Sequence, residues 1–285
     1  MTASRLPLRA SHCRGFTLLE IVLVMAITGV VAAMVGVFIR QPIDAYVDQV
    51  RRAELSDTAD LALRRISREL ARALPNSVRV DPGGTMLEFL PVAASGRYRA
   101  APAADGSGDF LDFDDPADTT FDVLGAPIDV AAGSQLVVYN LGLPGADAYS
   151  GESRRALVTS GNALASLGYA TGGTQFPFRS PGNRFQIVPG AVTYACLPGA
   201  GGTGQLRRYS GYPIQAAQPV DAGAAPLAAL AGRDAGLLAD KVESCSFGFG
   251  AGPASRIGVV TLNLTLVASG ERLTLVHQVH VDGSP

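Results

Sequence analysis

The sequence has few residues of the kinds that build catalytic and metal centres. It contains three cysteines, three histidines and no tryptophan in 285 residues. It has no phosphate-binding glycine loop, no Gly-x-Ser-x-Gly and no Cys-x-x-Cys. These are the motifs of nucleotide hydrolysis, serine hydrolysis and thiol redox chemistry. We therefore expect no enzymatic activity and no cofactor.

Two groups of potential metal ligands are present, and both are weak candidates. His277 and His280 are three residues apart on a predicted strand, which places them on opposite faces. Six aspartates gather in one segment without the Asp-x-Asp-x-Asp-Gly pattern of a calcium-binding EF-hand. They are Asp105, Asp109, Asp112, Asp114, Asp115 and Asp118. We expect a solvated acidic loop and no metal site, with calcium as the alternative for this loop.

One long apolar segment, residues 16–39, dominates the N-terminal part of the chain. Glu20 is the only ionisable side chain between Arg14 and Arg40. A helix over this segment would be roughly 36 Å long, and a bilayer's hydrocarbon core is about 30 Å thick. The sequence therefore predicts one membrane span. An ionisable group inside such a span is a functional hypothesis by default.

The basic segment before the span, residues 1–15, has an unusual position relative to the apolar helix. It carries Arg5, Arg9 and Arg14 and no acidic residue, which favours a cytoplasmic N-terminus. A cut after Gly15 would remove these charges and keep the apolar helix, whereas a secretory signal loses its apolar part as well. The formal charge would then change from −2 to −5. A mildly acidic protein of this kind is not expected to bind nucleic acid.

The junction Gly15-Phe16-Thr17-Leu18-Leu19-Glu20 resembles the class III signal of type IV prepilins and type II secretion pseudopilins. The resemblance implies that a prepilin peptidase cuts between Gly15 and Phe16 and that Phe16 is then N-methylated. It also implies that Glu20 pairs with the Phe16 amine of a neighbouring subunit during assembly. Two alternatives stay open. The segment could be an ordinary signal anchor, and Glu20 could be a tolerated charge near the lipid headgroups.

A helix is expected to continue beyond the span as an amphipathic segment, residues 40–74. Its apolar residues recur every three or four positions in two series, one from Ile43 to Val50 and one that resumes at Leu55, and Pro75 disfavours helix at residue 74. The stripe consists of Ile43, Val47, Val50, Leu55, Ala59, Ala62, Ile66, Leu70 and Ala73. The stripe is short for a coiled coil and lacks a sustained heptad, so we expect it to pack on a globular domain.

The remaining residues, 75–285, have the alternation and turn signals of an antiparallel β domain. We expect strands at 86–92, 135–140, 184–188, 192–196, 205–209, 242–249, 257–267 and 272–281. Gly270-Glu271 is expected to connect the last two strands as a hairpin. Residues 100–118 and 198–236 are expected to be long surface loops. The segment is long enough for one large core or for two lobes.

The cysteines divide at the predicted cleavage position. Cys13 would leave with the leader, and Cys196 and Cys245 would remain as a single pair. Because the span predicts export of the C-terminal part, we expect the pair to form a disulfide in an oxidising compartment. The alternative is two buried thiols that do not meet.

Further segments are similar to the MshO-like minor pilins of the mannose-sensitive haemagglutinin (MSHA) pilus system. They are 41–48, 51–55, 62–66, 73–79, 96–99, 111–113, 121–125 and 137–142, together with both cysteine contexts. The resemblance implies an α+β pilin-like fold in which a long N-terminal helix packs on an antiparallel sheet domain. It also implies a non-enzymatic subunit held in the inner membrane, with its head in the periplasm, and then moved into a fibre.

The partners implied are the prepilin peptidase, other major and minor pilins and an inner-membrane assembly platform. The large head suits a place at or near the pilus tip. Three alternatives stay open: a J-type minor pseudopilin of type II secretion, a tip adhesin that binds a surface ligand, and a membrane-anchored periplasmic enzyme.

Overall fold

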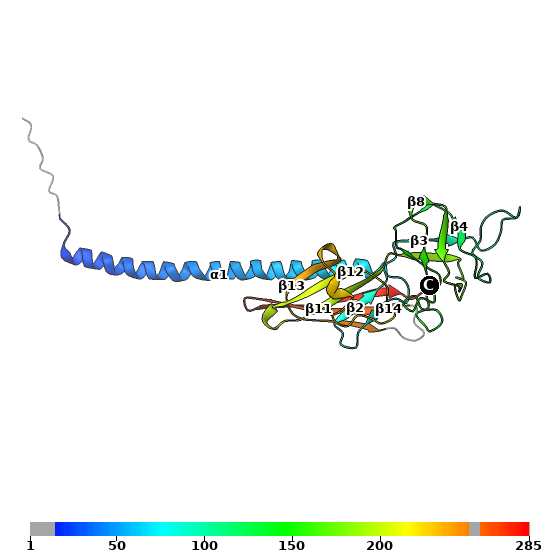
Figure 1. The fold of residues 1–285 in the computed structure, drawn as a ribbon. Helices are drawn as coiled ribbons and strands as arrows, with labels where there is room; N and C mark the ends of the chain where they lie inside the picture. Colours follow the sequence, from blue (N-terminus) through cyan, green and yellow to red (C-terminus); the bar gives the residue numbers. More distant parts are fainter. Residues whose placement is uncertain (1–14, 251–256, 285) are drawn as a thin grey trace, which may run out of the picture. The chain divides into compact units, whose positions relative to one another are not determined.

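A computed structural model describes residues 15–250 and 257–284. The predicted leader up to Arg14, including Cys13, lies outside the described residues, as do the side chains at positions 39–44, which include Ile43 of the predicted stripe, and at position 257. The chain divides into two compact units, residues 1–51 and 52–285. One long helix, α1 (Leu18–Leu70, 53 residues), contributes to both (Figure 1). An apolar helix followed by an antiparallel sheet domain confirms the predicted α+β pilin-like fold.

Helix α1 ends four residues before the predicted position. The backbone N–H of Leu74 donates to the Leu90 carbonyl at 2.7 Å, and that of Val92 donates to the Arg72 carbonyl at 2.9 Å. These bonds give the backbone after Leu70 partners in residues 90–92, where Pro91 forms an isolated β-bridge with Ala73, so the helix stops before Pro75 crowds it.

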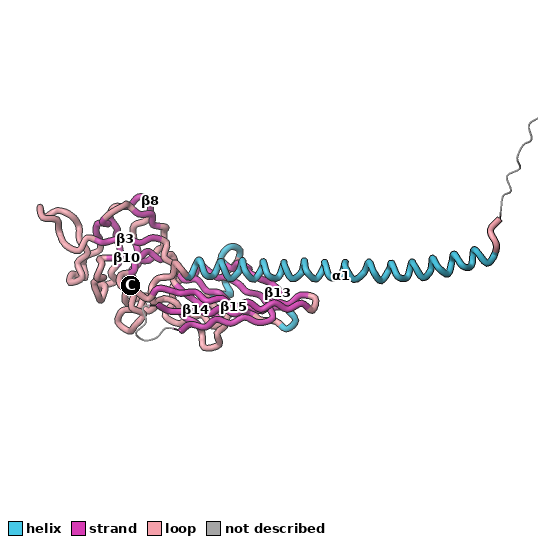
Figure 2. Tube along the Cα trace, turned by 180° about the vertical axis from the view of Figure 1, so that it is seen from behind, coloured by secondary structure: helices cyan, strands magenta, loops and turns pink. Residues whose placement is uncertain are grey.

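The second unit contains a seven-stranded antiparallel sheet. Its strand order is β1-β2-β11-β12-β13-β14-β15, and Figure 2 shows β13, β14 and β15 running side by side. The strands are β1 (Arg79–Val80), β2 (Met86–Phe89), β11 (Ala191–Leu197), β12 (Gly204–Tyr212), β13 (Ala235–Gly250), β14 (Ile257–Ala268) and β15 (Glu271–Asp282).

The C-terminal part of α1 covers one face of this sheet. Its stripe residues Leu55, Ala59, Ala62, Ile66 and Leu70 are at most 3% exposed, and they share one hydrophobic cluster with the sheet. The sheet residues of that cluster include Leu87, Phe89, Tyr194, Val260, Leu262 and Leu264. The predicted apolar stripe is thus confirmed from Leu55 to Leu70, where hydrophobic burial against the sheet holds α1. Val47 and Val50 are exposed, so the stripe does not pack over its first part, and Ala73 lies beyond the end of the helix.

A closed six-stranded barrel lies between β2 and β11 in the sequence. Its order is β10-β3-β4-β9-β7-β6, and a two-stranded sheet, β5-β8, accompanies it. The strands are β3 (Ala94–Tyr98), β4 (Thr120–Leu124), β5 (Ile128–Val130), β6 (Gln135–Val137), β7 (Arg154–Leu157), β8 (Gly161–Leu164), β9 (Ser166–Ala170) and β10 (Arg184–Val188). A separate cluster of buried side chains, including Tyr98, Phe121, Tyr169 and Phe185, fills it.

All eight predicted strands exist, but two predictions about the connections need correction. Residues 198–236 are not one loop, because β12 lies within them and β13 begins at Ala235. The β14–β15 hairpin turns on Ser269 and Gly270, one position earlier than predicted. Both have positive φ, 51° and 88°, as the tight turn of a two-residue hairpin requires. Residues 101–118 contain no helix or strand, as expected for a loop.

The predicted strand at 135–140 is shorter, because the chain turns after Val137. Tyr139 adopts a positive φ of 52°, and the buried Asn140 then serves as a polar anchor. Its side-chain Nδ2 donates to the Pro75 carbonyl at 2.7 Å, and its Oδ1 accepts from the Ala148 backbone at 2.8 Å. Asn140 therefore ties the barrel to the segment that follows α1.

A buried polar network connects β1, β2 and β12. Glu88 is 0% exposed; it accepts from Arg79 Nε at 2.6 Å and from the Tyr212 hydroxyl at 2.8 Å. Arg79 also lies over the Tyr149 ring, 3.5 Å from its centre, and donates to the carbonyls of residues 215 and 216. Burial raises the pKa of the Glu88 carboxyl, and the Arg79 charge opposes that rise.

We expect Arg79→Met to lower the free energy of unfolding by about 3–5 kcal/mol, because it leaves a buried carboxylate without its counter-charge. Urea unfolding of the detergent-solubilised chain, followed by tyrosine fluorescence, measures this loss. A carboxyl group with a raised folded-state pKa stabilises most below its unfolded pKa, and less as pH rises through the folded value. The loss should therefore be smaller near pH 4, where Glu88 takes up a proton, than near pH 7.

The double variant Arg79→Met/Glu88→Gln is the control. The difference in the free energy of unfolding between this double variant and Glu88→Gln should be the same at both pH values, because the titrating carboxyl group is absent from both. If Arg79→Met lost the same free energy of unfolding at both pH values, this would contradict the inference that Arg79 stabilises a charged Glu88.

Candidate functional site

The N-terminal end of α1 begins with a side-chain cap. The Glu20 backbone N–H donates to Thr17 Oγ1 at 3.2 Å and to the Thr17 carbonyl at 3.1 Å. Thr17 is therefore the N-cap, and Thr17-x-x-Glu20 has the spacing of a capping box. This arrangement starts the helix two residues after Phe16 and places Glu20 in its first turn, where a carboxylate faces the positive end of the helix dipole.

The side chains around Glu20 are open to the surroundings. Phe16 is 77% exposed and, with Glu20, Ile21, Val24 and Met25, lines a shallow hollow of about 250 Å³. Within the described part of the chain, the Glu20 side chain makes no ion pair or hydrogen bond. The structure thus places Phe16 and Glu20 on one face of the chain's first turn, without an internal partner for the carboxylate.

The packing of the described residues does not require glycine at position 15. Among them, no atom lies within 4 Å of a Cβ built there. A need for glycine here would therefore come from a molecule that binds this segment.

The apolar part of α1 has the length and composition of a membrane span. Residues Leu18–Phe38 form a 21-residue stretch with a mean hydropathy of 2.7, none of it buried in the protein. The hydroxyl group of Thr28, which lies in this stretch, has a hydrogen-bond partner within the helix. Its Oγ1 donates to the Val24 carbonyl at 2.6 Å. Such back-bonding hides a hydroxyl from lipid.

Cys196 and Cys245 form a disulfide, with their Cα atoms 5.8 Å apart. The bond joins β11 to β13 across the intervening β12. The Cα separation lies within the usual range for disulfides. The bond closes a loop with a sequence separation of 49 residues within the sheet that carries α1.

We expect Cys196→Ala/Cys245→Ala to lower the free energy of unfolding by about 4 kcal/mol, because the unfolded chain would regain the freedom of a loop of this length. Urea unfolding of the variant and of the wild type measures the difference. Adding a reductant should reproduce the loss in the wild type and leave the variant unchanged. Two alkylatable thiols in exported wild-type protein would contradict the bond.

The acidic loop uses its carboxylates mainly for its own turns. Asp118 accepts from the Asp112 backbone at 2.7 Å, and Asp105 accepts from the Ser107 hydroxyl at 2.6 Å. Asp114 pairs with Arg179 at 3.0 Å. His277 and His280 lie on β15. Among the described residues, no group of three or more His, Cys, Asp or Glu side chains could hold a metal ion.

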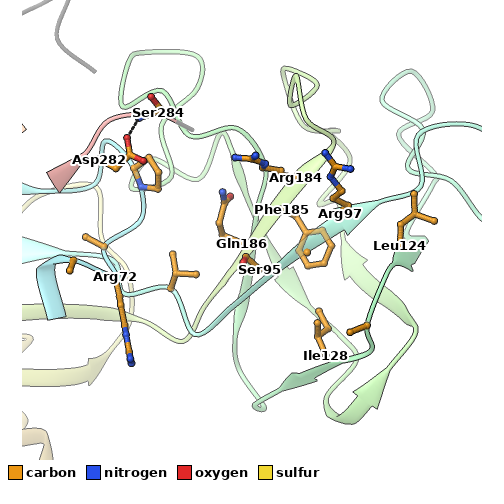
Figure 3. Close-up of a pocket in the computed structure, with 16 residues that line it drawn as sticks. Arg72, Ser95, Arg97, Leu124, Ile128, Arg184, Phe185, Gln186, Asp282 and Ser284 are labelled. Carbon is orange, nitrogen blue, oxygen red and sulfur yellow. Dashed lines mark hydrogen bonds between the residues drawn. The ribbon is translucent and has the colours of Figure 1, made fainter. Parts of the chain in front are cut away.

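Sequence reasoning missed a cleft of about 690 Å³ in the second unit. It lies beside the barrel strands β3 and β10, and Figure 3 shows Arg97 and Arg184 at one end and Arg72 at the other. The sequence predicts a strand at 184–188, but nothing in its local pattern shows that β3 pairs with it.

The comparison with protein families found the prokaryotic N-terminal methylation motif at residues 10–36. The match spans the Gly15–Phe16 junction, Glu20 and most of the apolar stretch. The comparisons with curated proteins and with solved structures returned no match. Together with the apolar helix and the α+β fold, the motif supports a type IV pilin- or pseudopilin-like subunit. Such a subunit is processed at its N-terminus, anchored by a single membrane span and assembled with other pilins.

Proposed function

We propose that the chain is a minor pilin of an MSHA-like type IV pilus, a structural and assembly subunit and not an enzyme. The observation that carries this proposal is the methylation motif at residues 10–36, which includes most of the apolar span of α1, Leu18–Phe38. The similarity of eight further segments to MshO-like minor pilins favours a pilus over a secretion system. A J-type minor pseudopilin of type II secretion is the alternative with the same overall plan.

We propose a separate role for each successive segment of the chain. Residues 1–15 are the leader, which the prepilin peptidase removes between Gly15 and Phe16. Residues 16–39 hold the subunit in the inner membrane, with its N-terminus in the cytoplasm. Residues 40–74, which are helical up to Leu70, lead from the membrane into the periplasmic head, residues 75–285. During assembly the platform extracts the subunit, and the apolar helix packs among those of other major and minor pilins.

Phe16 and Glu20 are the proposed assembly residues. The mature amine of Phe16, once N-methylated, offers a positive charge to Glu20 of an adjacent subunit. Because Glu20 is exposed and has no partner among the described residues, its carboxylate is available for such a contact. Pairing is needed because an isolated charge among apolar helices is costly.

The size of the head supports a position at or near the pilus tip. The second unit carries a complete barrel in addition to the sheet that packs on α1, and this bulk is difficult to fit laterally into a tight helical array. Mass spectrometry of sheared fibres tests the proposal. We expect peptides of this chain in the fibre fraction at a low ratio to the major pilin. Its recovery only in inner membranes would contradict a pilus position.

A further inference from the structure

The cleft of about 690 Å³ has an uneven distribution of charge. Three arginines and one carboxylate, Asp282, line it. The Asp282 carboxylate accepts from the Ser284 backbone at 2.8 Å and lies at the opposite end from Arg97 and Arg184 (Figure 3). The end formed by β3 and β10 is therefore positively charged.

Arg97 and Arg184 form a cross-strand pair of like charges. They lie directly opposite each other in the β3–β10 register, and Figure 3 shows both side chains extending to the same side of the strands. Like charges in this position destabilise a sheet unless something neutralises them. Among the described residues, neither guanidinium has an ion-pair or hydrogen-bond partner. At this end of the cleft, the N–H groups of two guanidinium groups are thus available to bind an anion.

The next pair of opposite residues on the same face of β3 and β10 is also polar. Ser95 and Gln186 lie opposite each other, two residues from the arginines on their own strands. The Oε1 atom of Gln186 is buried and accepts no hydrogen bond within the described residues. A buried acceptor without a donor is unfavourable. Gln186 lines the cleft, and rotation of its side-chain amide would bring this oxygen into contact with a hydroxyl or N–H group of a ligand held by the arginines.

We propose that the cleft binds a carboxylate-bearing sugar, of the uronic acid type. Its carboxylate would accept from Arg97 and Arg184, since guanidinium groups match carboxylate geometry. A ring hydroxyl would donate to Gln186, and the aliphatic side chains of Leu124 and Ile128 would contact the ring. The volume lies within the usual range for small-molecule sites. This inference goes beyond the pilin assignment and does not depend on it.

An acidic peptide is the less suitable occupant. Peptides recognised on sheets usually add a strand to an open edge. Here β10 pairs with both β3 and β6, and β3 pairs with both β10 and β4. The cleft end with the arginines therefore has no open strand edge to pair with a peptide backbone, whereas a sugar needs only side-chain donors and acceptors.

The test is calorimetric titration of the full detergent-solubilised chain with trigalacturonate. Two further ligands serve as comparisons: maltotriose, a neutral α-1,4-linked trisaccharide, and hexa-aspartate, an acidic peptide. We expect trigalacturonate to bind, with an affinity that falls as salt is raised. Arg97→Gln/Arg184→Gln should weaken it by about 10- to 100-fold. Gln186→Met, which keeps the side-chain volume without an acceptor, should weaken it by about three- to tenfold.

Arg233→Gln is the matched control, because Arg233 is exposed and does not line the cleft; it should bind like the wild type. Near-UV circular dichroism should show each variant folded, with the arginine variants at least as stable as the wild type because a like-charge contact is gone. Equal binding by the wild type and the double arginine variant, or no binding of trigalacturonate, would overturn the proposal. Tighter binding of hexa-aspartate or equal binding of maltotriose would overturn the sugar-acid assignment.

Discussion

Gly15→Leu is expected to leave the chain uncut, with its leader attached, and to remove it from sheared fibres almost completely. The physical reason is that a small residue must fit the peptidase cleft at the cut. The described part of the chain has room for a side chain here, because none of its atoms lies within 4 Å of a Cβ at position 15. The variant should therefore fold, insert and form its disulfide normally. Intact-mass measurement of the membrane fraction distinguishes the cut from the uncut chain.

Gly36→Leu is the matched control for the cleavage prediction. Gly36 lies in the exposed apolar part of α1 and, like Gly15, has open space around its Cβ position among the described residues, but it is distant in sequence from the cut. It should be processed like the wild type, and Gly15→Ala should fall between the two. A mature Phe16 N-terminus in Gly15→Leu at the wild-type level would contradict the proposed role of Gly15, as would retention of Met1 in assembled wild-type protein.

Glu20→Ala is expected to leave the protein made, cut and oxidised while strongly reducing its entry into fibres. In the membrane, Glu20 lies near one end of the span, where a carboxylate stays hydrated. In a fibre it would lie among apolar helices, where an unpaired charge costs several kcal/mol, and the proposed pairing with the Phe16 amine of a neighbour would relieve that cost. Removing the carboxylate leaves that amine unpaired instead. Glu20→Asp should be intermediate, because its shorter side chain reaches less far.

The measurement compares the amount of each variant in membranes with its amount in sheared fibres. Two further variants separate charge from helix capping. Glu20→Gln keeps the size and should behave like Glu20→Ala. Thr17→Ala removes the hydroxyl that accepts from the Glu20 backbone; it should weaken the helix start by about 1 kcal/mol and still permit incorporation. Equal incorporation of Glu20→Ala and wild type would mean that the carboxylate is only a tolerated interfacial charge.

The parts of the fold that the sequence predicts are those with a long, regular pattern. The stripe from Leu55 to Leu70 repeats over four turns of helix, and β14 and β15 are twelve residues each, so periodicity identifies them. Periodicity does not reveal the barrel, because its strands are only three to five residues long. β3 reads Ala-Ser-Gly-Arg-Tyr, a composition with little intrinsic strand preference. Pairing within the closed barrel, and not local propensity, makes it a strand.

The same distinction applies to the sites. The cleavage and assembly segment is a contiguous motif, so it can be found without a structure. The Arg97–Arg184 pair and the Glu88 network depend on pairing between distant strands, and no spacing in the chain signals them. Glu88, for example, meets Tyr212 across 124 positions of sequence.

The position of the barrel in the chain has a consequence for how this head can change over evolution. Strands β2 and β11 are antiparallel neighbours in the sheet, with Phe89 opposite Val192. All strands of the barrel lie between these two strands in the sequence. Topologically the barrel is thus an insertion into a single hairpin connection. The entropic cost of closing such a connection grows only slowly with its length. The barrel can therefore diverge, shrink or be exchanged as a module, while the sheet, the disulfide and the helix keep their geometry.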